Sequence, residues 1–326
     1  MGTQRSIGAG LGMAVLSAAT FGTSGTFARS LIGAGWTAET AVVARIGIAG
    51  LILAVPAVWA MRGRWRSLRG SLGTMGPFGV LAVAGAQLAF FKAIQYVPVG
   101  VALLLEYSGI LLVVAWMWVV HGERPRPLTV AGAAAAIAGL VLVLDLTGAA
   151  GVDPLGIAWG LGAGVGLAAY FVLSARVDAE LPSVALASGG MAIGAAMLVA
   201  LGLTGILHLH ATFEPVTFAG HQVSWLVPVA GLSVIAAVIA YVAGIGAARV
   251  LGAALSSFVG LTEVLFAIVF AWFALGEVPT LMQAVGGVLI IVGIALVRAG
   301  MLRPVVDRAK STSDDSAEPA LAGAQC

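Results

Sequence analysis

Long apolar runs recur along the whole chain, and short stretches of polar or turn-forming residues separate them. An α-helix needs about 20 mainly apolar residues to cross the hydrocarbon core of a bilayer, so each run predicts one transmembrane helix. The runs are too long for barrel strands and lack their two-residue alternation. The pattern therefore predicts an all-α integral membrane protein with ten transmembrane helices. The predicted helices cover residues 7–28, 39–60, 72–94, 99–120, 128–146, 155–176, 183–204, 223–246, 253–274 and 281–299.

Composition supports the same class of protein. Of the 326 residues, 60% are hydrophobic and 9% are charged, and the mean hydropathy is +1.07. A soluble domain carries about 25% charged residues, so a water-soluble fold is excluded. The single cysteine, Cys326, excludes a disulfide framework and a thiol metal site.

The basic residues show how the helices are oriented. Thirteen of them precede the first predicted helix or follow an even-numbered one, whereas Arg29 alone lies on the opposite side. The positive-inside rule then predicts that both termini lie in the cytoplasm. We expect a multi-pass protein of a bacterial cytoplasmic (inner) membrane. The same rule accounts for the sequence pI of about 9.0, so no nucleic-acid partner is expected. The thirteen residues are Arg5, Arg62, Arg64, Arg66, Arg69, Arg124, Arg126, Arg176, Arg249, Arg298, Arg303, Arg308 and Lys310.

The chain also contains an internal repeat. The segment GERPRPLTVAGAAAAIAGLVLV, which begins at Gly122, aligns with GEVPTLMQAVGGVLIIVGIALV, which begins at Gly276, 154 residues later. Five helices per half is an odd number, so the second half must enter the membrane upside down, as in many secondary transporters. The shared positions are Trp118/Trp272, Gly122/Gly276, Glu123/Glu277, Pro125/Pro279, Gly132/Gly286, Ile137/Ile291 and Gly139/Gly293.

The charges of aligned residues agree with this inversion. Arg124 and Arg126 lie on the predicted inner side, and their counterparts Val278 and Thr280 on the outer side carry no charge. We therefore predict two inverted five-helix repeats, residues 1–148 and 149–300. A disordered cytoplasmic tail, residues 301–326, is expected to follow them.

The repeat, its Gly-Glu-x-Pro turns and two longer runs resemble the EamA-type carriers of the drug/metabolite transporter superfamily. The runs are FFKAIQYVPVGVALLLEYSGILLVVAWMWVVHGERP, from residue 90, and GAARVLGAALSSFVGLTEVLFAIVFAWFALGE, from residue 246. Where that family usually has Leu-Glu-Pro, this chain has Thr262-Glu263-Val264, so the proline that would kink the ninth helix is absent. The Leu-Glu-Tyr-Ser-Gly segment ending at Gly109 is similar to the subset related to threonine/homoserine exporters, with Ile110 at their proline position. The resemblance implies a small-molecule carrier, commonly an exporter.

The ionisable residues of the predicted helices that matter most are Arg45, Lys92, Glu106 and Glu263. Each costs about 2.5 to 3.5 kcal/mol at a helix centre, so each needs a partner, a wet cavity or a function. Glu106 and Arg45 are each about 10 Å deep from the outer side at 1.5 Å per residue, and Lys92 lies across a short turn from Glu106. Glu263 lies near the middle of the ninth helix.

These charges have two interpretations. In the functional one, Glu106 and Glu263 face a cavity between the repeats and exchange a proton or hold a substrate ammonium, while Arg45 holds a carboxylate. In the structural one, Arg45 or Lys92 forms a static ion pair with Glu106 or extends to the outer interface. The two glutamates do not align at the offset of 154 residues, so a symmetric pair of proton carriers is not predicted.

Weaker candidates surround these charges. Ser24 lies in a glycine-flanked part of the first helix, where small residues also suit helix packing. Ser256 shares a face of the ninth helix with Glu263. Further polar groups serve either as substrate contacts or as interhelical hydrogen bonds; they are Gln87, Tyr107, Tyr170 and Tyr241.

Motifs for other chemistry are absent from the sequence. The loop residues His208, His210, His221 and Glu214 lack a metal-ligand spacing, and no nucleotide-binding loop or catalytic dyad is present. No metal, cofactor or catalytic residue is therefore expected.

The sequence thus predicts a secondary active transporter that exports amino acids or related zwitterions by alternating access with proton coupling. Its expected partners are a small-molecule substrate, protons and the lipid bilayer, and it is expected to be a monomer or a homodimer. Efflux of lipophilic cations or drugs is the alternative transport function. A membrane enzyme or sensor is the alternative outside transport.

Overall fold

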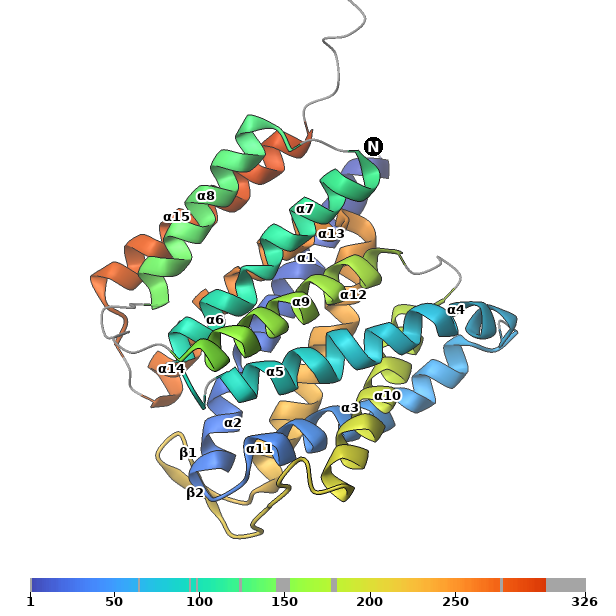
Figure 1. Ribbon diagram of the computed structural model, residues 1–326, viewed down its shortest axis with the longest axis vertical. Helices are drawn as coiled ribbons and strands as arrows, with labels where there is room; N and C mark the ends of the chain where they lie inside the picture. Colours follow the sequence, from blue (N-terminus) through green and yellow to red (C-terminus); the bar gives the residue numbers. More distant parts are fainter. Residues whose placement is uncertain are drawn as a thin grey trace, which may run out of the picture.

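The computed structural model describes residues 2–63, 65–93, 95–97, 99–122, 125–144, 153–176, 181–275 and 278–302 (Figure 1). Within these residues, ten helical segments are long and apolar enough to cross a membrane, which confirms the predicted number. We call them spans 1 to 10 in chain order. The fold is an all-α membrane protein.

The first five spans are built from eight α-helices and one π-helix. Span 1 is α1 (Gly2–Gly22) with α2 (Ser24–Gly33); span 2 is α3 (Ala38–Ala60); span 3 is α4 (Trp65–Pro77), η1 (Phe78–Gly85) and α5 (Ala86–Ala93); span 4 is α6 (Val99–Tyr107) with α7 (Gly109–His121); span 5 is α8 (Pro127–Leu144).

The second five spans are built from seven α-helices and one π-helix. Span 6 is α9 (Pro154–Arg176); span 7 is α10 (Ser183–Leu203); span 8 is α11 (Leu226–Ala230), η3 (Gly231–Ile239) and α12 (Ala240–Leu251); span 9 is α13 (Ala253–Gly260) with α14 (Thr262–Leu275); span 10 is α15 (Leu281–Leu302). The predicted start of span 8 at residue 223 was wrong, because that residue belongs to a β-strand. The predicted tail beyond Leu302 lies outside the described residues.

Span 4 and span 9 are interrupted at positions that differ by one residue in the repeat alignment. Ser108 separates α6 from α7, and Leu261 separates α13 from α14. Ser108 donates a hydrogen bond from Oγ to the carbonyl oxygen of Leu105 at 2.5 Å, and Thr262, 154 residues later, does the same to Val259 at 2.7 Å. Such hydroxyl groups compete with backbone N–H donors and bend helices. Span 9 is therefore interrupted although its family proline is missing.

Span 3 and span 8 each contain a π-helical segment, which the sequence pattern did not predict. The segment η1 ends at Gly85 and η3 ends at Ile239, again 154 residues apart. A π-helix is rare and usually appears as a short insertion near a functional site. The repeat therefore extends to irregular backbone that apolar periodicity does not reveal.

The contact between α8 and α15 shows the inversion directly (Figure 1). A Cβ atom built at Gly132 would lie 2.6 Å from the carbonyl oxygen of Gly293, and one built at Gly139 would lie 2.5 Å from that of Gly286. Gly132 aligns with Gly286 and Gly139 with Gly293, so the two contacts exchange when the repeats are exchanged. The two helices are antiparallel, as an inverted repeat requires.

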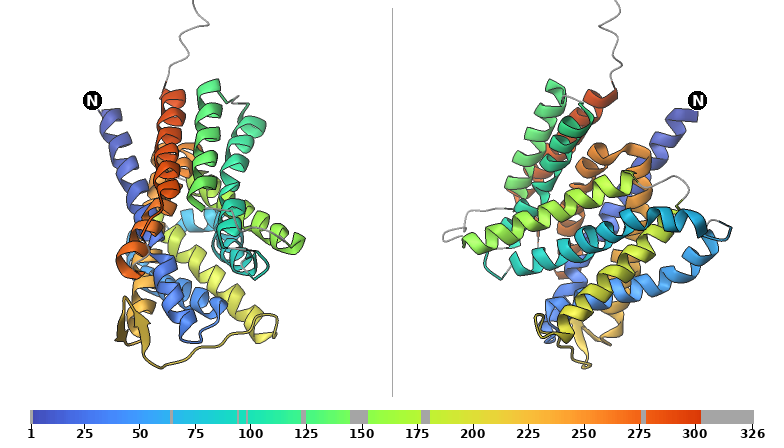
Figure 2. Two further views of the ribbon diagram at one scale, coloured as in Figure 1. Left: turned by 90° about the vertical axis from the view of Figure 1, so that its left-hand side faces the viewer. Right: turned by 45° about the vertical axis from the view of Figure 1, so that its right-hand side comes forward.

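A β-hairpin occupies the loop between spans 7 and 8. Strand β1 (Val216–Phe218) pairs antiparallel with β2 (His221–Val223), and Val216 faces Val223. The ring of Phe218 stacks on Phe27 of α2, with centroids 5.3 Å apart. Figure 2 shows the hairpin at the opposite end of the molecule from the start of α1. We call these ends the hairpin side and the terminal side.

The buried apolar side chains form two main clusters. One contains Ile46, Phe78 and Met191 from spans 2, 3 and 7. The other contains Leu140 and Phe258 with further residues of spans 4, 5, 9 and 10. In a bilayer, such close packing rather than water exclusion holds helices together.

Candidate functional site

A cavity of about 300 Å³ lies within the helix bundle, and spans 1, 2, 3, 4, 6, 8 and 9 line it. All the predicted site residues except Lys92 and Tyr107 reach its wall. Its polar lining consists of Ser17, Ser24, Arg45, Gln87, Glu106, Tyr170, Tyr241, Ser256 and Glu263.

Arg45 is the cation of this cavity, and its side chain contacts neutral groups. Its Nη1 atom donates to Oγ of Ser24 at 3.0 Å and to Oε1 of Gln87 at 3.5 Å, and Nη2 donates to the carbonyl oxygen of Ala236 at 2.5 Å. The guanidinium carbon lies 5.6 Å from the centre of the Phe21 ring. Its Nε atom is buried and has no hydrogen-bond partner. One donor of a buried cation is therefore left unsatisfied, which carries an energetic cost.

The two cavity carboxylates lie beside interruptions of helices from different repeats. Glu106 is in the last turn of α6, and Glu263 is in the first turn of α14. Among the described residues, no nitrogen–oxygen distance within 4.0 Å joins Arg45 to either carboxylate. The structure therefore shows separated charges around the cavity and not a static pair between Arg45 and Glu106.

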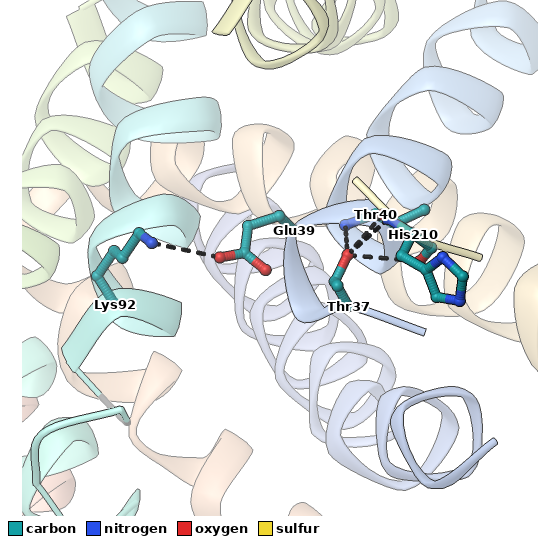
Figure 3. Close-up of polar contacts among 5 residues, drawn as sticks. All are labelled: Thr37, Glu39, Thr40, Lys92 and His210. Carbon is teal, nitrogen blue, oxygen red and sulfur yellow. Dashed lines mark hydrogen bonds and ion pairs between the residues drawn. The ribbon is translucent and has the colours of Figure 1, made fainter. Parts of the chain in front are cut away.

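Lys92 lies outside the cavity. Its Nζ atom is 3.5 Å from Oε1 of Glu39, the second residue of α3 (Figure 3). Thr37 caps that helix, accepting a hydrogen bond from the Thr40 amide at 3.4 Å. The proposed contact between Lys92 and Glu106 is not seen. Glu39 was missed because it lies at the edge of a predicted helix, where a charge needs no explanation.

Tyr107 joins the two repeats beside the cavity. Its side chain is buried, with 4% exposed, and packs in one apolar cluster with Phe258 and Leu261 of span 9. Glu106, the residue before it, faces the cavity itself. Of these two consecutive residues of α6, Glu106 therefore lies at the cavity and Tyr107 lies at the contact with span 9.

Aromatic rings form much of the remaining wall. The ring centroids of Phe21 and Tyr241 are 5.1 Å apart, those of Tyr170 and Tyr241 are 5.5 Å apart, and those of Tyr170 and Phe171 are 5.0 Å apart. Such edge-to-face contacts hold rings in fixed positions. Sequence reasoning missed the phenylalanines, because Phe is an ordinary residue of an apolar helix.

Among the described residues, no group of three or more His, Cys, Asp or Glu side chains is able to hold a metal ion. The cavity has the groups needed to bind a ligand, namely a cation, two carboxylates and aromatic rings around a small volume.

Interrupted helices that surround a buried polar cavity between inverted repeats are characteristic of secondary transporters. The fold and the site therefore define a multi-pass membrane transporter. Both halves, residues 8–145 and 154–299, match the model of the EamA-like transporter family, and the chain belongs to that family.

Named relatives cover only part of the chain. The threonine/homoserine exporter RhtA of Salmonella typhimurium is 32% identical over 123 residues, in strain SL1344 and in strain LT2. These matches cover 37% of this chain and 39% of the relatives' length. A crystal structure of a protein that is 20% identical has a TM-score of 0.68, covering 90% of this chain and 98% of that one. At this identity the likeness concerns the fold alone.

Proposed function

We propose that this transporter exports small zwitterions of the amino-acid type by alternating access, in exchange for protons. The observation that carries the proposal is the separation of Arg45 from Glu106 and Glu263 around one cavity. A guanidinium binds a carboxylate through charge-assisted hydrogen bonds, and a carboxylate binds an ammonium group. A free zwitterion offers both groups.

Cavity size and the relatives agree with a small substrate. The volume of about 300 Å³ is at the lower end of the range for ligand pockets, about 300 to 1,000 Å³. The relative RhtA is named as an exporter of threonine and homoserine, both of which are zwitterions. We further propose that the terminal side faces the cytoplasm of a bacterium, so that export runs toward the hairpin side.

Efflux of lipophilic cations is the second candidate. The aromatic wall around Phe21, Tyr170 and Tyr241 favours it, because aromatic faces attract cations. That function needs the two glutamates but gives Arg45 no part in binding.

Substitution Arg45→Gln in sealed proteoliposomes separates the two functions. We expect uptake of zwitterions to fall about tenfold or more, since a hydrogen bond to a charged group contributes about 1.5 to 3 kcal/mol. Uptake of lipophilic cations should persist. A panel of radiolabelled amino acids and cationic dyes, assayed with an imposed pH gradient, measures both.

Arg62→Gln is the matched control, because Arg62 is exposed at the end of α3 and stacks on Trp59, 5.0 Å from its ring centre. It should leave the uptake of both classes unchanged. Undiminished zwitterion uptake by a folded Arg45→Gln variant would show that Arg45 does not bind the carboxylate.

A further inference from the structure

Gln87 joins Arg45 to the second repeat. Its side-chain oxygen Oε1 accepts a hydrogen bond from Nη1 of Arg45 at 3.5 Å, and its Nε2 donates to the hydroxyl of Tyr241 at 3.3 Å. The bonds connect α3, α5 and α12 across the cavity wall. The two contacts fix which end of the amide faces the guanidinium, because only the oxygen accepts and only the nitrogen donates.

The backbone brings Gln87 and Tyr241 together through the repeat. The two residues are 154 positions apart, which is the repeat offset, and each lies two residues beyond the end of a π-helical segment. The wider turn of a π-helix shifts the register of the helix that follows it. Equivalent shifts in the two repeats therefore place equivalent side chains in contact with each other.

The surroundings of Arg45 leave its charge uncompensated at close range. Its side chain is 8% exposed, and its contacts are a hydroxyl, an amide oxygen, a carbonyl oxygen and an aromatic ring. Gln87 is the only one of these contacts whose side chain has a charged counterpart of the same shape. A glutamate in its place would put a carboxylate oxygen where the amide oxygen now accepts from Nη1. That change would neutralise Arg45 inside the protein.

We propose that Gln87 determines the substrate class of the cavity. Its neutral amide holds the Arg45 guanidinium in position and leaves the positive charge for the carboxylate of a zwitterion. With glutamate at position 87, the internal ion pair replaces that carboxylate, and Glu106 and Glu263 then favour simple amines. The inference rests on the proposed function and goes beyond it, because it assigns substrate selection to a residue that itself carries no charge.

The test compares each amino acid with the amine that lacks only its carboxylate. The pairs are L-leucine with isopentylamine, L-phenylalanine with phenethylamine and L-threonine with 1-aminopropan-2-ol. Uptake into proteoliposomes is measured for the wild type, Gln87→Glu and Gln87→Met. The ratio of zwitterion to amine uptake should fall about tenfold or more in Gln87→Glu, because the substrate carboxylate loses about one hydrogen bond to a charged group. Gln87→Met is neutral and similar in length. It removes the hydrogen bond to Arg45 without adding a charge, so it should lower the ratio by less than Gln87→Glu does.

A charge added after folding gives a second route if Gln87→Glu does not fold. The chain contains one cysteine, Cys326, so Gln87→Cys in a Cys326→Ser background carries a single thiol. Modification with 2-sulfonatoethyl methanethiosulfonate adds a negative group beside Arg45, and methyl methanethiosulfonate adds a neutral one. Only the anionic adduct should lower the uptake ratio.

The outcomes separate the inference from the proposed function. If the wild type moves zwitterions and both anionic changes leave the ratio as it was, the role of Gln87 is refuted and the zwitterion carrier stands. If the wild type moves the amines but none of the zwitterions, the proposed function fails and this inference fails with it.

Discussion

Arg45, Glu106 and Glu263 reach one cavity from spans 2, 4 and 9, and in the described part of the chain none of them neutralises another within ion-pair distance. A single ionisable group within a membrane costs about 2.5 to 3.5 kcal/mol on insertion scales. Pairing would recover part of that cost, so keeping the three charges apart makes the folded protein less stable. Such losses of stability usually mark residues kept for function.

A first prediction at this scale concerns proton coupling. Replacing Glu263 by Gln removes a titratable group from the cavity and keeps its shape. We expect uptake driven by a pH gradient to fall to the level of empty liposomes, while exchange of internal for external substrate continues. Both are measured with the same radiolabelled amino acid in the presence and absence of a pH gradient.

Glu39→Gln is the control for this change, because Glu39 is a carboxylate outside the cavity that pairs with Lys92. It should retain uptake driven by the pH gradient. Continued accumulation of substrate by Glu263→Gln would assign the proton to another group.

The charges of the site were predictable from the sequence, but their partners were not. An ionisable residue inside an apolar run is conspicuous, so Arg45, Glu106 and Glu263 were found without a structure. Lys92 was a candidate partner of Glu106 because a short turn separates the two residues, and the structure pairs it with Glu39 instead. A side chain as long as that of Lys has several neighbours at one depth, and sequence spacing does not determine which of them it contacts.

At the scale of helices, the irregular segments are the features that apolar patterning did not reveal. Spans 3 and 8 contain π-helical segments, and spans 1, 4 and 9 are interrupted at Thr23, Ser108 and Leu261. A membrane helix is apolar on most sides, so its hydrophobic pattern carries little information about register. The hydroxyl groups at positions 108 and 262 were a usable signal, since they recur at the repeat offset and bend helices.

The packing of α8 on α15 makes a prediction at this scale. In Gly139→Ala, the new methyl group would lie 2.5 Å from the carbonyl oxygen of Gly286 and 2.8 Å from the amide nitrogen of Ile290. The helices must move apart, which should destabilise the protein by about 1 to 3 kcal/mol. Unfolding in detergent with increasing denaturant measures the change.

Gly12→Ala is the matched control, because a Cβ atom at Gly12 of α1 meets nothing within 4 Å. That variant should be as stable as the wild type or slightly more so, since alanine favours helices. Equal destabilisation by the two substitutions would contradict the close contact.

At the scale of the whole molecule, the number of spans followed from the sequence because the thickness of a bilayer fixes the length of each apolar run. The inversion also followed, from an odd number of helices per repeat. The arrangement of seven spans around one cavity did not follow, because many packings of ten apolar helices satisfy the same pattern. Only the structure brings Gln87 of the first repeat to Tyr241 of the second.

The orientation in the membrane is a prediction for the whole chain. In a Cys326→Ser background, single cysteines are introduced at Gln222 on the hairpin side and at Arg62 on the terminal side, both exposed. In cells whose outer membrane has been removed, a membrane-impermeant maleimide should label Gln222→Cys. It should label Arg62→Cys only after the cytoplasmic membrane has been lysed. The reverse labelling would place the terminal side outside.

The hairpin loop ties the two repeats together on the hairpin side. Thr37 donates its backbone N–H to the carbonyl oxygen of His210 at 3.0 Å, and Nε1 of Trp36 donates to the carbonyl oxygen of Thr212 at 2.7 Å. The equivalent connection in the first repeat, between spans 2 and 3, runs only from residue 61 to 69. In a perfectly symmetric inverted repeat, the forms open to either side of the membrane would be degenerate in free energy. The loop of residues 61–69 is shorter than the hairpin loop, so the two sides differ in their connections. We expect this difference to lift the degeneracy and to give the empty carrier a preferred resting state.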